Sequence, residues 1–306
     1  MSILSWPGRV LAGTAASCVA FERPQYEALV VRGPDRASWL NGLLTSNVTQ
    51  LQPGIGGWGL ALNKQGKIQS ELFLVASADE LLLFAPPGQS QALLDTFDRF
   101  LIMEDAELER SSSWRLVILV GPQASSVAAR SNAPWGELDL LGLGGALLAL
   151  SEPNHATQLR ALEQQAALGD AVTWEALRVE GGLPEWGRDY AAESNPHEAG
   201  LAHRAQGVGP VDWNKGCYLG QEVVCMQDMR GKVRRSLFPL VIRGAQALRP
   251  PAAVVAAAGA EVVGELRTAT PSQALGGQAG FAYLKTSAAE QQLSVDGRAA
   301  ELLTQP

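Results

Sequence analysis

The chain has 306 residues, of which 46% are hydrophobic and 18% are charged, and its formal net charge is −7. This length predicts two or three packed units, and the composition excludes an intrinsically disordered chain. The negative charge also excludes a surface that attracts nucleic acid as a whole, so any nucleic-acid site must be a local basic patch.

The three cysteines indicate the redox compartment. Cys18, Cys217 and Cys225 form an odd, widely spaced set, which argues against a disulfide framework and for a reducing environment. The small apolar residues before Cys18 resemble a lipoprotein signal only weakly, because Pro7 and Gly13 interrupt them. No run reaches the roughly 18 apolar residues that cross a bilayer. We therefore expect a cytoplasmic protein with no membrane partner.

The N-terminal third of the chain alternates strands and helices. Short apolar runs bounded by turn residues predict four strands, at 26–32, 58–63, 68–76 and 81–85. Asp35 is placed to cap a helix that carries Trp39 and Leu44. Apolar residues at helical spacing predict a second helix over 89–102.

A second set of elements follows from Trp114. The predicted strands lie at 116–120, 137–141 and 146–150, and the predicted helices lie at 155–168 and 172–180. Helices combined with short antiparallel hairpins are typical of α+β units rather than of a doubly wound sheet. The polar, turn-rich residues 191–209 then predict a loop.

After Arg235 the chain changes character. Short apolar runs between Gly and Pro residues have the pattern of a small antiparallel β-barrel. The predicted barrel strands lie at 237–242, 254–257, 261–267, 279–284 and 292–295. The predicted organisation is therefore a region at 1–235, made of two α+β units at roughly 20–110 and 111–235, followed by a barrel domain at 236–306.

The densest chemistry lies at residues 212–222, Asp-Trp-Asn-Lys-Gly-Cys-Tyr-Leu-Gly-Gln-Glu. Gly216 and Gly220 bracket Cys217 and permit positive φ or the close approach of another group. Lys215 stands two residues before the thiol and can lower its pKa, which favours the reactive thiolate. The alternative interpretation is a turn with a half-buried cysteine, since free cysteine often behaves as a small hydrophobe.

Residues 215–222, Lys-Gly-Cys-Tyr-Leu-Gly-Gln-Glu, resemble the signature of the YgfZ family, folate-binding relatives of the glycine-cleavage T-protein (aminomethyltransferase). Shorter and less specific sequence matches to the same family extend the resemblance over most of residues 26–285. It implies a T-protein-like α+β fold, in which two ferredoxin-like units and a C-terminal antiparallel β-barrel surround a central cavity. It also implies a role in maintaining iron–sulfur proteins and, through them, in tRNA modification.

The same resemblance implies a folate site. Residues 178–182, Arg-Val-Glu-Gly-Gly, resemble the family's Arg-x-Glu-x-Gly segment, whose Glu hydrogen-bonds the pterin ring. Glu180 would then accept a pair of charge-assisted N–H bonds from the aminopyrimidine edge of tetrahydrofolate or a derivative. The alternative is a helix-end Glu in water. The further cofactor contacts that we expect come from Arg178, Tyr218, Gln221 and Arg230.

Cys217 is the expected reactive thiol, with Lys215 tuning it and Gly216, Gly220 and Glu222 shaping its loop. Nucleophilic catalysis would need a base, for which His197 and His203 are candidates. A spacing of eight residues between Cys217 and Cys225 matches no common zinc pattern, so we predict no fixed metal site. The resemblance instead implies redox chemistry or a transient iron–sulfur cluster at Cys217. Cys225 is predicted to be a buried strand residue.

Departures from the aminomethyltransferase pattern argue against conventional catalysis. That branch carries Gly-Gly-x-x-Asp-Asp, and the matching stretch here has Ser70 and Glu71 in place of the two Asp residues. Serine is no carboxylate, and the longer Glu71 is displaced enough to spoil catalytic geometry. We expect an accessory protein whose partners are folate and iron–sulfur assembly proteins or client cluster enzymes. The alternative is a folate-dependent aminomethyltransferase-like enzyme that uses Glu71.

One basic run, at residues 230–235, is dense enough to bind an anion. If the run is extended, Arg230, Lys232 and Arg234 share one face. With Arg235, they could hold the glutamate tail of folate or RNA phosphates, which leaves an RNA-binding module as a third hypothesis. A charge-protected edge strand without a binding role is the alternative. His197 is a further departure, since the segment Pro196-His197-Glu198 resembles a Pro-Gln-Glu pattern.

Overall fold

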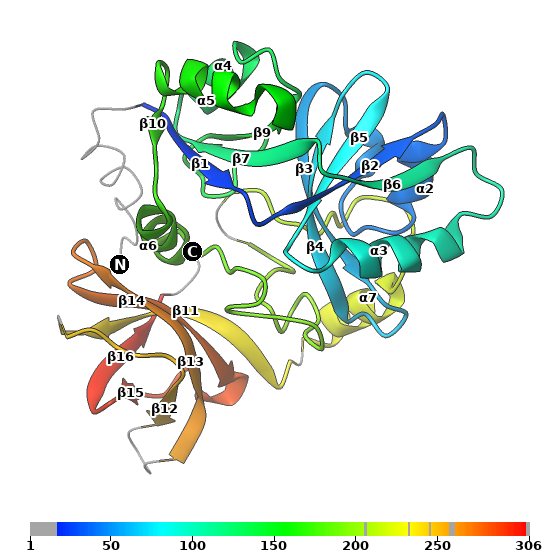
Figure 1. Ribbon diagram of the computed structural model, residues 1–306. Helices are drawn as coiled ribbons and strands as arrows, with labels where there is room; N and C mark the ends of the chain where they lie inside the picture. The colour runs from blue at the N-terminus through cyan, green and yellow to red at the C-terminus, as the bar shows by residue number, and fades with distance from the viewer. Residues whose placement is uncertain (1–16, 205–206, 232, 245, 257–260, 304–306) are drawn as a thin grey trace.

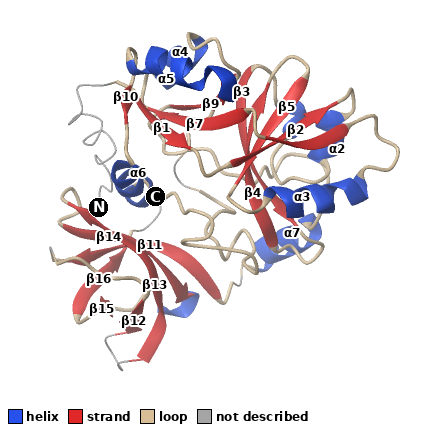
Figure 2. Ribbon diagram, viewed as in Figure 1, coloured by secondary structure: helices blue, strands red, loops and turns tan. Residues whose placement is uncertain are grey.

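The computed structural model describes residues 17–204, 207–231, 233–244, 246–256 and 261–303. Most of the weak signal-like segment lies at residues 1–16, outside the described residues, and Lys232 lies outside them too. An open sheet and a closed barrel dominate the fold (Figure 1, Figure 2). Across the described ranges, no helix has the length and apolar character that would span a membrane.

The open sheet has ten strands in the order β10-β1-β7-β9-β8-β3-β4-β5-β2-β6. These strands are β1 (Val19–Arg23), β2 (Glu27–Arg32), β3 (Gly54–Leu62), β4 (Ile68–Ala76), β5 (Glu80–Ala85), β6 (Glu107–Ser111), β7 (Trp114–Val120), β8 (Trp135–Glu137), β9 (Gly145–Ser151) and β10 (Ala167–Leu168). Most neighbours pair antiparallel, and β1 with β10 and β3 with β8 pair parallel.

The β3–β8 pair joins two halves of the sheet, β10-β1-β7-β9-β8 and β3-β4-β5-β2-β6. The halves follow the two sets of elements in the sequence except for β1, which precedes β2 in the chain but pairs with β7 in the other half. Gly54 pairs with Gly136, and Ile55 pairs with Glu137. A Cβ at Gly136 would stand 2.3 Å from the backbone nitrogen of Gly56, so this close approach requires glycine. The glycine-rich residues 54–59 therefore form part of strand β3.

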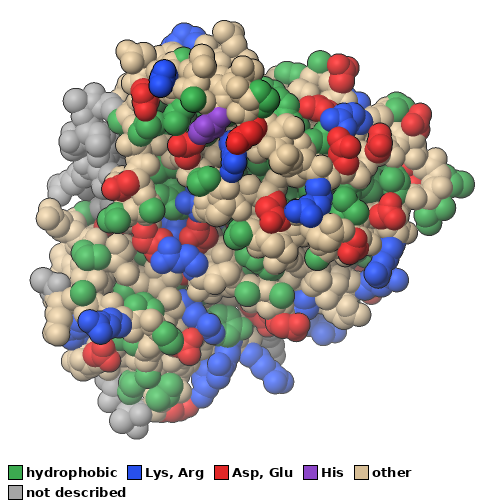
Figure 3. All heavy atoms as spheres, viewed as in Figure 1, with side chains coloured by type: hydrophobic (Ala, Val, Ile, Leu, Met, Phe, Trp, Pro, Cys, Tyr) green, Lys and Arg blue, Asp and Glu red, His purple; other side chains and the backbone are tan. Residues whose placement is uncertain are grey.

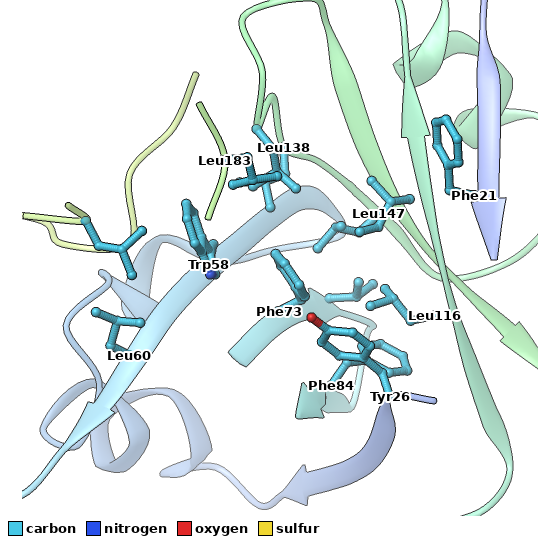
Figure 4. Close-up of a cluster of buried hydrophobic side chains, with 14 of the residues drawn as sticks. Phe21, Tyr26, Trp58, Leu60, Phe73, Phe84, Leu116, Leu138, Leu147 and Leu183 are labelled. Atoms are coloured by element: carbon cyan, nitrogen blue, oxygen red, sulfur yellow. The ribbon is translucent and has the colours of Figure 1, made fainter. Parts of the chain in front are cut away.

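Helices cover the outer faces of the sheet, and its inner faces share one core. The helices are α2 (Arg36–Asn41), α3 (Ser90–Phe97), α4 (Ala124–Ala129), α5 (His155–Glu163), α6 (Ala171–Glu180) and α7 (Gln221–Arg230), with 3₁₀ turns η1 (Val48–Gln50), η2 (Asp98–Phe100), η3 (Glu152–Asn154) and η4 (Thr286–Ala288). Alternation in β2 shows the layering: Leu29 and Val31 join the core under α2 and α3, while Ala28 and Val30 join the inner core. Figure 4 shows Trp58, Phe73 and other aromatic and leucine side chains meeting in that inner core.

The barrel closes in the order β11-β14-β13-β12-β15-β16. Its strands are β11 (Arg235–Arg243), β12 (Ala252–Ala256), β13 (Glu261–Ser272), β14 (Gly277–Lys285), β15 (Leu293–Val295) and β16 (Arg298–Leu302). Helix α6 packs against β13 and β14 and so lies between the sheet and the barrel (Figure 1). The predicted combination of α+β elements with a C-terminal antiparallel barrel is confirmed.

Candidate functional site

Lys215 fastens the loop that carries Cys217 to the end of α2. Its buried ammonium donates to the carbonyl oxygens of Asn41, Leu44 and Ser46 at 2.6, 2.6 and 2.8 Å. Burial lowers the pKa of Lys215 to about 8. Since these carbonyls take all three donors of the ammonium, it has none left for the thiol. Lys215 therefore anchors this loop, and its tuning of Cys217 stays a prediction.

The two motif glycines differ in what they do. Gly220 has a φ of 81° at the start of α7, and a Cβ there would stand 2.5 Å from the carbonyl oxygen of Asn63 in the β3–β4 hairpin. Gly220 thus has both properties expected of a motif glycine, a positive φ and the close approach of another group. Gly216 fits neither, because its φ lies outside the left-handed region and a Cβ there would meet nothing within 4 Å.

Cys217 is exposed. It lies between buried Lys215 and buried Tyr218, whose ring centroid is 5.2 Å from the lysine Nζ. Burial, and to a smaller extent the nearby thiol of Cys225, raises the pKa of Tyr218. An exposed thiol held between two buried anchors can meet a partner molecule without rearrangement of the core.

Helix α7 corrects the prediction for Cys225. The helix begins at Gln221, whose backbone N–H donates to the carbonyl of Tyr218 at 3.1 Å, and Glu222 lies exposed in its first turn. Cys225 is half-buried on this helix and is not a buried strand residue. The β-branched neighbours that suggested a strand sit in a helix because glycines in the left-handed conformation bound it on both sides.

Glu180 ends α6 where that helix packs on the barrel. Its side chain is buried, and its Oε2 has no hydrogen-bond partner within the part of the chain that the structure describes. Burial raises the pKa of Glu180 to about 7, and the hydroxyl of Ser272 on β13 partly offsets this effect. The alternative of a helix-end Glu in water is therefore wrong. A buried carboxylate oxygen without a partner fits the pterin-binding role implied by the sequence.

Arg178, two residues before Glu180, is fully buried and has a structural role. Its Nε and Nη2 donate to Glu175 at 2.8 and 2.9 Å, and its Nη1 donates to Asp189 at 2.6 Å. Asp189 in turn accepts a bond from the hydroxyl of Thr268 on β13. Because each guanidinium nitrogen donates to protein, the prediction of a cofactor contact at Arg178 is corrected to an ion-pair network that ties α6 to the barrel.

Glu71, the carboxylate of the enzyme alternative, is buried and held by two phenols. The hydroxyl of Tyr26 donates to its Oε1 at 2.8 Å, and that of Tyr190 donates to its Oε2 at 2.6 Å. Burial raises the pKa of Glu71, although both hydrogen bonds act in the opposite direction. Each oxygen therefore has a protein partner, unlike Oε2 of Glu180. Ser70 beside it is also buried.

The basic run turns rather than extends. Arg230 ends α7, and Gly231 adopts a φ of 58° that stops the helix, so Arg230 and Arg234 do not share one strand face. Arg234 and Arg235 instead line a cavity of about 1100 Å³ beside β11, with Lys285. On the face drawn in Figure 3, Lys and Arg side chains gather at the lower edge, between the barrel and α7.

His197 and His203, the candidate bases, both contact Asp228 of α7. The Nε2 atoms lie 3.3 and 2.6 Å from its Oδ1, respectively. Burial lowers the pKa of His197, and the two imidazoles lower the pKa of Asp228. Sequence reasoning missed Asp228, since the expected strand concealed the helix face that presents it. The substitution of His for Gln at 197 was the signal that pointed here.

Fold and sequence together define a class. The family described as the GCVT N-terminal domain matches residues 12–135. The crystal structure of glycine cleavage system aminomethyltransferase T from Bartonella henselae superposes with a TM-score of 0.79, covering 96% of this chain and 87% of that one at 18% identity. The chain therefore has the fold of the glycine-cleavage T-protein.

Two kinds of curated protein are similar to this chain in sequence. An aminomethyltransferase of Thermosynechococcus vestitus is 27% identical over an alignment of 290 residues that covers 84% of this chain and 74% of the relative. The tRNA-modifying protein YgfZ of Edwardsiella ictaluri is 27% identical over an alignment of 223 residues that covers 68% of this chain and 66% of the relative. That of Colwellia psychrerythraea is 24% identical over 72% and 70%. The resemblance to the YgfZ proteins and their aminomethyltransferase relatives is thus confirmed.

Proposed function

We propose that this protein is a YgfZ-like, folate-binding accessory protein that supports iron–sulfur enzymes, including enzymes that modify tRNA. The observation that carries the proposal is that Oε2 of Glu180 is buried and has no hydrogen-bond partner among the residues that the structure describes. A carboxylate in this state favours a ligand that brings N–H donors, because an unsatisfied buried acceptor costs about 1–3 kcal/mol. The aminopyrimidine edge of a reduced folate has such donors.

Glu180 would hold the pterin, and Arg178 would hold the helix that presents Glu180. The pKa of about 7 means that the side chain is partly protonated near neutral pH. A bound pterin that donates hydrogen bonds favours the ionised form. Bound folate would supply its reduced pterin as a carrier of one-carbon groups or electrons. Contacts to it from Tyr218, Gln221 and Arg230 remain predictions.

Cys217 would be the group that meets the iron–sulfur partner. Its exposure suits contact with a client enzyme, an assembly protein or a transiently bound cluster. The Lys215 and Gly220 anchors hold its backbone against two neighbouring segments. Cys225, eight residues further on in α7, is half-buried, so it provides a matched control for a role that needs an accessible thiol.

The test is rescue in cells that lack the native protein. Wild type, Cys217→Ala, Cys225→Ala and Glu180→Gln are expressed at matched levels, and cluster-enzyme activity and thiolated tRNA are measured. We expect wild type and Cys225→Ala to restore both, and Cys217→Ala and Glu180→Gln to fail. Full rescue by Cys217→Ala would remove the thiol from the proposal, and full rescue by Glu180→Gln would remove the folate contact.

The aminomethyltransferase alternative has weaker support. It needs a carboxylate free to act on folate, whereas both oxygens of Glu71 are engaged by tyrosine hydroxyls. Tetrahydrofolate-dependent formaldehyde release or aminomethyl transfer by the purified protein would restore it. The RNA-binding alternative requires affinity that falls steeply with salt, which filter binding at two salt concentrations measures.

A further inference from the structure

We propose that His197, His203 and Asp228 form a binding site for one divalent transition-metal ion, of the Zn²⁺ or Fe²⁺ class. The three side chains come from two segments that flank the Cys217 loop: the imidazoles from the loop before it and the carboxylate from α7 after it. Each offers one ligand atom, and these atoms lie within 4.8 Å of one another. The proposal is independent of folate binding and of the role of Cys217.

The spacing suits metal coordination. Bonds of 2.0–2.1 Å in a tetrahedral site hold ligand atoms roughly 3.3 Å apart. The Nε2 of His197 already lies 3.3 Å from Oδ1 of Asp228, and the Nε2 of His203 lies 2.6 Å from it. Binding of an ion therefore requires the Nε2 of His203 to move outward from Oδ1 of Asp228. The imidazole of His203 is 60% exposed, so this movement does not disturb the core.

Packing orients the imidazoles before any ion binds. The ring of His203 stacks on Trp213 with centroids 4.7 Å apart and planes 7° from parallel. The indole of Trp213 is itself fixed, because its Nε1 donates to the carbonyl of Ala202 at 3.0 Å. The backbone of His197 is tied to the barrel, since the hydroxyl of Ser236 donates to its carbonyl at 2.8 Å. Such preorganisation reduces the entropy cost of binding an ion.

A further observation favours a metal site over a simple ion pair between the histidines and Asp228. The side chain of His197 is only 9% exposed, so its Nε2 faces Asp228 from a ring that is already largely withdrawn from solvent. A ring that served only as a surface ion-pair partner would not need this burial. Two imidazoles and one carboxylate are a donor set that suits Zn²⁺ and Fe²⁺.

The site is open on one side. Both histidines line the cavity of about 1100 Å³ that also contains Arg234, Arg235 and Lys285. Three protein ligands leave at least one coordination position free, as in sites where the metal takes water or another ligand. The three cations would favour an anionic fourth ligand. The geometry is therefore that of an exchangeable or reactive metal site rather than a closed structural one.

Metal titration of untagged, chelator-treated full-length protein tests the site. Zn²⁺ binding is measured by calorimetry, and Co²⁺ is added separately so that its visible spectrum reports the ligands. We expect one equivalent to bind, with no thiolate-to-cobalt charge-transfer band. His197→Gln and Asp228→Asn should each weaken Zn²⁺ binding by at least about 100-fold, since even second-shell changes cost 10- to 100-fold.

The third histidine of the chain supplies the matched control. His155 also pairs with a carboxylate, its Nε2 lying 2.6 Å from Oε1 of Glu22, and His155→Gln should leave Zn²⁺ affinity unchanged. His203→Asn, at an exposed position, replaces any variant whose circular dichroism shows misfolding, and it should show the same loss. Absence of one-to-one binding, equal losses in His155→Gln and His197→Gln, or a thiolate band would overturn the proposal.

Discussion

The ammonium of Lys215 lies 2.6 Å from the carbonyl oxygen of Leu44, a residue 171 positions earlier in the chain. This bond and its two neighbours join the Cys217 motif to the end of α2. A lysine beside a cysteine had suggested a tuned thiol. The structure shows a buried cation that satisfies three carbonyl groups and sets the position of the loop.

Lys215→Met should therefore destabilise the fold. It leaves buried carbonyls without their charged donor, and the expected loss in free energy of unfolding is about 2–4 kcal/mol. Urea denaturation followed by circular dichroism measures it. Lys64→Met, at an exposed position of the β3–β4 turn, should change stability by less than about 0.5 kcal/mol. Equal effects of the two substitutions would show that Lys215 is no anchor.

The motif glycines offer a second matched pair. Gly220→Ala forces a side chain into left-handed backbone at 2.5 Å from the Asn63 carbonyl, and it should cost about 1–3 kcal/mol. Gly216→Ala, at an open position with ordinary φ, should be neutral within about 0.5 kcal/mol. Thermal unfolding of both variants distinguishes them. A neutral Gly220→Ala would contradict the close packing of the motif loop on the hairpin.

Arg178 should matter for stability well beyond the surface ion pairs. Arg178→Met leaves Asp189 buried without its charged partner and should cost about 3–5 kcal/mol. The exposed pair of Arg243 and Glu301 on the barrel also has two hydrogen bonds, yet Arg243→Met should cost less than about 1 kcal/mol. Denaturant unfolding of each variant measures the difference. A small loss at Arg178 would argue against a structural network and reopen a ligand-binding role.

The raised pKa of Glu180 predicts how the stability of the fold depends on pH. Its pKa is about 7 in the folded protein and 4.5 as the ordinary value, so folding favours the protonated form. The associated stability is fully present below about pH 4.5 and is lost as pH rises through about 7. Wild type should therefore lose stability relative to Glu180→Gln between pH 5 and pH 8. Parallel stability curves for the two proteins over this range would contradict the raised pKa.

The sequence predicted those features that local chemistry determines. Gly and Pro residues between short strands marked the barrel, and the Arg-x-Glu-x-Gly segment drew attention to Glu180. The joining of both halves into one sheet was not predictable, because the pair Gly54 and Gly136 depends on contact between distant glycines.

The roles of the polar site residues could not be predicted either, because their hydrogen-bond partners lie elsewhere in the chain. Lys215 bonds to carbonyls 169 to 174 residues away, and Arg178 bonds to Asp189 across a loop. Helix α7 was missed because Val224 is its one buried residue, so its apolar residues show no helical period. This helix can be recognised only from the glycines that bound it, and the position of Asp228 on the helix was missed for the same reason.

Direct titration with tetrahydrofolate is the measurement that tests the central claim most closely. Anaerobic calorimetry on wild type should show one folate bound per chain, and Glu180→Gln should weaken this binding by about 10-fold or more, the equivalent of one charge-assisted hydrogen bond. Glu71→Gln, at a carboxylate whose oxygens both have tyrosine partners, should weaken it less. Absence of folate binding by wild type, or unchanged affinity in Glu180→Gln, would contradict the account.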